Sequence, residues 1–74
     1  MIILQKHTRY YKIFICKTLF QNYEVERIYG NINYKSYTGN RRNFFDNLEN
    51  AQDFINKTLR EKIKRGYEIK KLLK

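Results

Sequence analysis

The residues of this 74-residue chain that are best suited to chemistry are aromatic and basic side chains set close together. Lys and Arg number 16 against 7 Asp and Glu, which gives a formal net charge of +9, and 16% of the residues are aromatic. Tyr10, Lys12 and Phe14 occupy alternate positions, so in an extended segment they share one face. Cations neutralise phosphates and aromatic rings stack on bases, so this pattern favours contact with nucleic acid.

Further candidates for such contacts follow in the same part of the chain. Arg41 and Arg42 lie in an expected turn, from which they can reach phosphates. The predicted phosphate contacts are Lys12, Lys35, Arg41 and Arg42. Tyr37 is predicted to contact a sugar or a base. The alternative interpretation is that the aromatic residues are ordinary strand formers and that the cations keep the sheet soluble.

A catalytic site would require a positioned nucleophile, an acid or base, or a metal. His7, Cys16 and Ser36 are the only His, Cys and Ser, and they are far apart in the sequence. One His and one Cys cannot complete a four-ligand zinc site, and one Cys cannot form an intramolecular disulfide. The three glycines fit turns or a helix cap rather than a phosphate-binding loop. We therefore expect no enzyme activity, no metal site and no cofactor.

The positive charge is concentrated at the two ends of the chain. Residues 1–22 carry a net charge of +4, residues 23–56 carry −1 and residues 57–74 carry +6. No apolar run approaches the roughly 18 residues that a membrane-spanning helix needs, and the N-terminus lacks the pattern of a signal peptide. We therefore expect an intracellular protein, cytoplasmic or nucleoid-associated, that does not bind membranes.

Alternating apolar and polar residues and turn residues predict the elements that position these side chains. The expected antiparallel sheet has four strands, at about residues 9–17, 23–29, 32–37 and 42–45. Gly30-Asn31 is expected to turn the chain between the second and third strands, and Thr38-Gly39-Asn40 between the third and fourth.

One helix is expected at about residues 47–65. Asn47 is a suitable N-cap, and Gly66 is a suitable residue to end the helix. Apolar residues recur there at spacings of three and four, at Leu48, Ala51, Phe54, Ile55, Leu59 and Ile63. This periodicity predicts one apolar helix face that must be buried.

The predicted fold is therefore α+β, with the helix packed across one face of the antiparallel sheet. The helix is expected to cover Tyr11, Ile13, Ile15 and Val25, which leaves the other sheet face open. Residues 1–74 are expected to form a single domain, with 1–8 and 67–74 as terminal extensions.

The order of these elements and several short segments resemble a WGR domain, a small module of poly(ADP-ribose) polymerases and of some bacterial proteins. Arg9-Tyr10-Tyr11-Lys12-Ile13-Phe14-Ile15 is similar to the opening strand of that family. Arg27-Ile28-Tyr29-Gly30-Asn31-Ile32-Asn33 lies where the family has its Trp-Gly-Arg-aliphatic-Gly signature. The segment from Phe45 to Ala51 resembles the helix entry, and that from Glu61 to Tyr67 the helix exit. The resemblance extends from about Arg9 to Glu68.

Within the signature, Tyr29 stands in place of Trp, and Asn31 and Asn33 stand in place of Arg and Gly. For the polymerase members, the resemblance implies binding near DNA ends, with the Trp against a terminal nucleotide. It implies that Arg27, Tyr29 and Asn31 belong to the nucleic-acid-binding residues of this chain. The expected function is that of a small basic domain that binds the backbone or the ends of duplex DNA with little sequence specificity.

The alternative function is that of a stand-alone protein-interaction or regulatory module that does not bind nucleic acid. Met1–Leu4 is an apolar start that could add an edge strand or form a homodimer contact. The two functions depend on different surfaces of the domain. Loss of the aromatic and basic sheet face is expected to abolish nucleic-acid binding, whereas loss of residues 1–4 or 69–73 is expected to abolish assembly.

Overall fold

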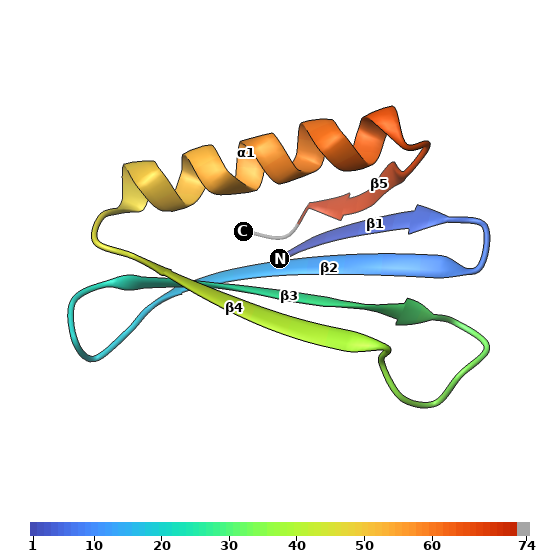
Figure 1. Ribbon diagram of the computed structural model, residues 1–74, viewed down its shortest axis with the longest axis horizontal. Helices are drawn as coiled ribbons and strands as arrows, with labels where there is room; N and C mark the ends of the chain where they lie inside the picture. The colour runs from blue at the N-terminus through green and yellow to red at the C-terminus, as the bar shows by residue number, and fades with distance from the viewer. Residues whose placement is uncertain (73–74) are drawn as a thin grey trace.

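In the computed structural model, which describes residues 1–72, one helix lies across one face of a single antiparallel sheet of five strands (Figure 1). Residues 73 and 74, at the end of the expected C-terminal extension, lie outside the described residues. The elements are β1 (Ile2–Lys6), β2 (Arg9–Lys17), β3 (Tyr23–Asn31), β4 (Gly39–Phe45), α1 (Leu48–Lys64) and β5 (Glu68–Leu72). The order of the strands in the sheet is β4-β3-β2-β1-β5. The helix-on-sheet arrangement is confirmed, whereas the expected number of four strands is wrong.

Two of these strands, β1 and β5, lie in segments that were expected to be terminal extensions. β1 pairs with β2 through a tight turn at His7 and Thr8, where His7 has a φ of 53°. This turn lacks the Gly or Asn that commonly marks a hairpin. β5 pairs with the other side of β1. Because β1 was not predicted, the sequence offered no partner strand for β5. Because both edges of β1 are paired, Met1–Leu4 offers no free edge for strand addition.

The expected strand at 32–37 is wrong, and so are the turns expected on either side of it. β3 continues to Asn31, and β4 already begins at Gly39. The side-chain oxygen of Asn31 accepts a hydrogen bond from the backbone N–H of Asn33 at 2.8 Å. An Asn side chain bonded in this way favours a turn over an extended strand. Residues 32–38 therefore form the β3–β4 loop.

The helix begins and ends close to the residues that the sequence predicts. Asn47 is the N-cap, and its side-chain oxygen accepts a hydrogen bond from the backbone N–H of Asn50 at 2.8 Å. Gly66 follows the helix with a φ of 97°, a left-handed conformation that glycine adopts without strain. Among residues 1–72, no helix is long and apolar enough to cross a bilayer.

The hydrophobic core lies between α1 and the sheet. Its buried apolar side chains are Leu4, Tyr11, Ile13, Val25, Ala51 and Ile55. The pairing of β2, β3 and β4 places their odd-numbered residues on this helix side of the sheet and their even-numbered residues on the opposite, open side. No described element covers the open side (Figure 1).

Candidate nucleic-acid interface

The register of the sheet separates the predicted contact residues into three places. The helix side carries Arg27, Tyr29 and Arg41, with Asn31 at the end of β3. The open side carries Lys12 and Arg42. The β3–β4 loop carries Lys35 and Tyr37. The three helix-side residues Arg27, Tyr29 and Arg41 are therefore brought together, whereas Lys12 and Arg42 are directed away from them.

A cationic cleft lies between the C-terminal half of α1 and the part of the sheet formed by β2, β3 and β4. Its cavity measures about 240 Å³ and is lined by Tyr11, Arg27, Tyr29, Arg41, Lys62 and Tyr67, which we call the helix–sheet cleft. A neighbouring cavity of about 250 Å³ shares Tyr11, Arg27 and Lys62 with it and extends along the helix to Arg65. Five cations and one carboxylate, Glu61, thus line these two adjoining cavities.

Arg27 is held in the cleft by neutral groups. Its Nη2 donates a hydrogen bond to Asn43 Oδ1 at 2.9 Å, and its Nη1 donates a longer one to the Tyr11 hydroxyl at 3.4 Å. Its Cζ lies 5.0 Å from the centroid of the Phe54 ring. Its Nε is buried and has no hydrogen-bond partner within the described chain. The guanidinium is therefore fixed in place without a carboxylate to balance its charge.

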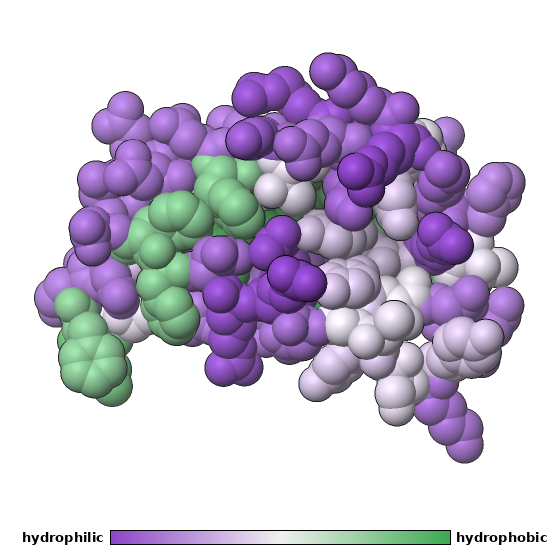
Figure 2. All heavy atoms as spheres, viewed as in Figure 1, coloured by the Kyte–Doolittle hydropathy of each residue, from purple (hydrophilic) through white to green (hydrophobic). Residues whose placement is uncertain are grey.

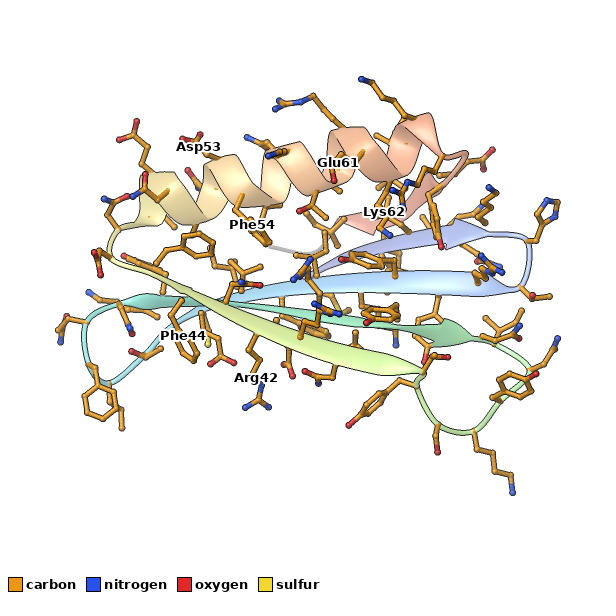
Figure 3. The ribbon with its side chains drawn as sticks, viewed as in Figure 1. Arg42, Phe44, Asp53, Phe54, Glu61 and Lys62 are labelled. Carbon is orange, nitrogen blue, oxygen red and sulfur yellow. The ribbon has the colours of Figure 1, made fainter. Side chains whose placement is uncertain are left out.

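Lys62 enters the cleft from the helix, and Figure 3 shows it directed toward the sheet. Its Nζ lies 4.3 Å from the centroid of the Tyr11 ring and 5.4 Å from that of Tyr67. Burial, followed by repulsion from Arg65 and Arg27, lowers the pKa of Lys62 below its usual value. Burial also raises the pKa of Tyr11, although Arg27 opposes that shift. Glu61, which lines the neighbouring cavity, opposes the shift of Lys62 but does not cancel it.

Tyr29 connects the strands that form the floor of the cleft. Its ring stacks on Tyr11, with the centroids 5.7 Å apart and an angle of 11° between the planes. It also lies across Gly39 of β4, where an added Cβ would be 2.4 Å from the ring. A hydrogen bond with Tyr29 raises the pKa of Arg41 above its usual value. The absence of a side chain at Gly39 therefore leaves room for the Tyr29 ring.

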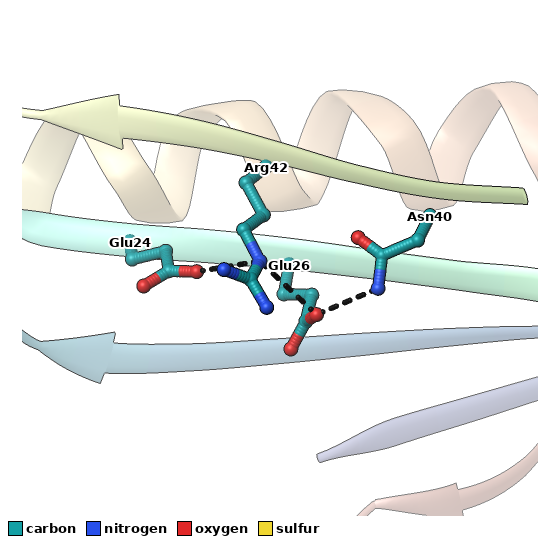
Figure 4. A network of polar contacts seen from close by, with 4 residues as sticks. All are labelled: Glu24, Glu26, Asn40 and Arg42. Carbon is teal, nitrogen blue, oxygen red and sulfur yellow. Dashed lines mark hydrogen bonds and ion pairs between the residues drawn. The ribbon is translucent and has the colours of Figure 1, made fainter.

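The charges on the open side of the sheet are balanced instead. Arg42 Nε lies 3.3 Å from a carboxylate oxygen of Glu24 and 3.3 Å from one of Glu26 (Figure 4). Asn40 donates a hydrogen bond to the same oxygen of Glu26 at 2.8 Å. The Asn40 amide, assisted by Arg42, holds the pKa of Glu26 below its usual value despite opposing desolvation. The charge of Arg42 is already compensated, unlike that of its neighbour in sequence, Arg41.

A third cavity, which we call the tyrosine pocket, lies beside the helix–sheet cleft. It measures about 330 Å³ and is lined by Arg9, Tyr10, Tyr29, Gly30, Asn31, Tyr34, Thr38 and Tyr67. Tyr29 and Tyr67 also line the cleft, so the two hollows share two of their lining residues. Figure 2 shows side chains of intermediate hydropathy gathered below the C-terminal half of α1, beside strongly hydrophilic ones.

Two residues of the interface, Lys62 and Tyr67, were not predicted from the sequence. A signal for Lys62 was present, because Ala51, Ile55 and Thr58 are the buried residues of the helix and Lys62 continues the same row. Tyr67 follows Gly66, and its position depends on the turn into β5, which was not expected. Within residues 1–72, no three His, Cys, Asp or Glu side chains form a group that could hold a metal ion.

Comparisons with known proteins agree with the fold. The family model of the WGR domain matches residues 3–72, which is essentially the whole chain and includes both β1 and β5. Searches of curated proteins and of solved structures gave no match. The matched region contains the helix, the five strands and the cleft between them, and the chain therefore belongs to the WGR domain family.

Proposed function

We propose that this WGR domain binds nucleic acid, chiefly the backbone or the ends of duplex DNA, through the helix–sheet cleft. A WGR domain is a small binding module rather than a catalytic domain, and in poly(ADP-ribose) polymerases it is associated with nucleic-acid binding. The observation that carries the proposal is the convergence of Arg27, Arg41 and Lys62. None of the three forms an ion pair with a carboxylate in the part of the chain that the structure describes.

Such a cluster of cations has a physical reason to bind an anion. Like charges brought together at the edge of a low-dielectric core repel one another, and a phosphate placed between them removes that repulsion. Contacts to phosphates carry no base identity, so binding through this cleft is expected to have little sequence specificity. Lys35 and Tyr37, in the nearby β3–β4 loop, would contact the flanking backbone.

Arg41 and Arg42 allow a test with matched charges. Arg41→Gln is expected to lower the affinity for a short blunt DNA duplex about fivefold, because one uncompensated phosphate contact is lost. It is also expected to reduce the slope of log affinity against log salt by about 0.9. Arg42→Gln removes the same charge from the open side and is expected to change affinity and slope much less. Fluorescence anisotropy between about 50 and 200 mM salt measures both quantities.

The two variants distinguish a defined cleft from a general effect of net charge. Equal losses for Arg41→Gln and Arg42→Gln would mean that the whole basic surface attracts the duplex and that the cleft has no special part. A wild-type chain that does not bind at low salt would reject nucleic-acid binding altogether. Circular dichroism of both variants checks that neither substitution unfolds the domain.

A second candidate function, binding to a protein, is favoured by the turn between β2 and β3. Leu19 and Phe20 project from this turn with 96% and 88% of their surfaces exposed. The turn is ordered by a hydrogen bond from the backbone N–H of Thr18 to the carbonyl oxygen of Asn22 at 2.9 Å. Two large apolar side chains held in water in this way are typical of a contact surface. This surface replaces Met1–Leu4 as the place where two copies would meet.

For this second function, we expect the wild-type chain to dimerise at high concentration. A variant with both Leu19→Ser and Phe20→Ser is expected to remain monomeric, because the apolar contact is removed. Sedimentation equilibrium measures the change. The variant is expected to keep its affinity for nucleic acid, since the turn lies at the opposite end of β3 from Tyr29. A wild-type chain that stays monomeric would exclude contact between copies.

A further inference from the structure

The tyrosine pocket and the helix–sheet cleft together have the layout of a site for one nucleotide. The cleft presents the cations Arg27, Arg41 and Lys62, and the adjoining pocket presents tyrosine rings. Tyr29 and Tyr67 line both hollows. In a nucleotide, a phosphate and a base are likewise joined at short range through a sugar. A phosphate in the cleft would therefore place its own base at the mouth of the pocket.

We propose that the tyrosine pocket receives an unpaired base, so that the preferred ligand is a DNA end with a single-stranded tail rather than a blunt duplex. This inference rests on the proposed function, because it needs the phosphate to be held in the cleft. A base inside a duplex is covered on both faces by its neighbours, and its edge is paired. The terminal base pair of a blunt end exposes one face but stays paired, whereas an unpaired base can leave the stack and enter a hollow lined by aromatic side chains.

The size and exposure of the pocket fit this ligand. Its volume of about 330 Å³ is near the lower end of the range of roughly 300–1,000 Å³ for small-molecule sites, as expected for a single nucleoside. Tyr34 lines the pocket from the β3–β4 loop with 69% of its surface exposed. An exposed ring beside a hollow is available for stacking at no cost in core packing.

We expect stacking, rather than contacts to base edges, to supply most of the affinity of the pocket for a base. Arg9 and Asn31 are the lining side chains suited to read a base edge, and one N–H and one oxygen lone pair of the Asn31 amide are already engaged. Its Nδ2 donates to Thr8 Oγ1 at 3.1 Å, and its Oδ1 accepts from the backbone N–H of Asn33 at 2.8 Å. Recognition would thus depend on stacking, which every base can provide.

Three labelled DNA hairpins test the proposal by anisotropy with the full chain. One has a blunt end, one carries a short thymine tail, and one carries a tail of abasic sugars with the same number of phosphates. The wild-type chain is expected to bind the thymine tail about tenfold more tightly than the other two. The abasic tail separates stacking of the base from the attraction of additional phosphates.

Tyr34→Ala is expected to remove the preference for the thymine tail while leaving the affinity for the blunt hairpin unchanged. Phe44→Ala is the matched control, since Phe44 is an exposed aromatic residue, 58% accessible, that points away from the cleft on the open side (Figure 3). It should keep the preference. Arg41→Gln should weaken binding of all three hairpins in similar proportion.

The outcomes separate this inference from the proposed function. Equal wild-type affinity for all three hairpins would overturn the unpaired-base site and leave the phosphate cleft standing. Equal, tighter binding of both tails would also overturn it, because the phosphates alone would then account for the gain. Loss of affinity for the blunt hairpin in Tyr34→Ala would mean that this ring contacts duplex instead. Failure to bind any hairpin would reject the proposed function itself.

Discussion

Leu4→Ala is expected to lower the free energy of unfolding by about 3 kcal/mol, because it opens a cavity in the hydrophobic core of a very small domain. Leu4 is completely buried. In the sheet it lies opposite Tyr11 of β2 and Ile69 of β5, so its side chain belongs to the central part of the structure. A domain of about this size has few kcal/mol of stability to lose. Urea denaturation followed by circular dichroism measures the change.

Leu19→Ala is the matched control, since it removes the same atoms from a side chain that is 96% exposed. Its free energy of unfolding should stay within about 0.5 kcal/mol of the wild-type value. A loss of less than about 1 kcal/mol for Leu4→Ala would contradict the position of β1 inside the sheet. The same experiment therefore tests the two strands that the sequence pattern did not predict.

The parts of the fold that could be predicted are those whose signals are local. Asn47, Gly66 and an apolar residue every three or four positions are enough to define a helix of 17 residues nearly to its ends. β2 has the predicted bounds, because alternation along nine residues is a local property. β1 and β5 depend instead on each other, and their partners are more than 60 residues apart in the sequence. A short segment such as Ile2–Lys6 has no alternation long enough to reveal a strand.

The loop at 32–38 shows how one side chain can decide between strand and turn. Tyr34 and Tyr37 have strand-forming side chains, and their place between two expected turns favoured an extended segment. The hydrogen bonds made by Asn31 end β3 and redirect the chain, and no measure of average strand preference includes them. This turn matters for the proposed base-binding site, because the loop that it forms brings Tyr34 to the tyrosine pocket.

The candidate site was predicted only in part for a related reason. Alternation assigns Arg27 and Tyr29 to one face, whereas Arg41 joins them only through the register of β3 and β4. Alternation also does not say which cations already have a carboxylate partner. Arg41 and Arg42 are adjacent and chemically identical, yet only Arg42 is paired with Glu24 and Glu26. The open side is therefore nearly balanced in charge, and the unbalanced charge lies beneath the helix. Tertiary pairing, which the sequence does not display, decides where an anion would bind.

Arg27→Met is expected to change affinity and stability in opposite directions, as is typical of a residue kept for binding rather than for folding. The affinity for duplex DNA should fall about thirtyfold, since charge-assisted hydrogen bonds to a phosphate contribute roughly 1.5–3 kcal/mol. The free energy of unfolding should rise by about 1 kcal/mol, because a partly buried charge with an unpartnered Nε is replaced by an apolar chain of similar length. Methionine can also keep the contact with Phe54.

Arg60→Met provides the comparison for Arg27→Met, because it removes an equal charge from an exposed helix position that lines neither the cleft nor the pocket. Anisotropy and urea denaturation on the two variants should separate them clearly, with Arg60→Met close to wild type in both. If Arg27→Met destabilises the domain and leaves affinity unchanged, Arg27 is a structural residue that joins Tyr11 and Asn43. If stability rises while affinity falls, the hydrogen bonds of Arg27 to Tyr11 and Asn43 do not account for its charge, and binding to a phosphate does.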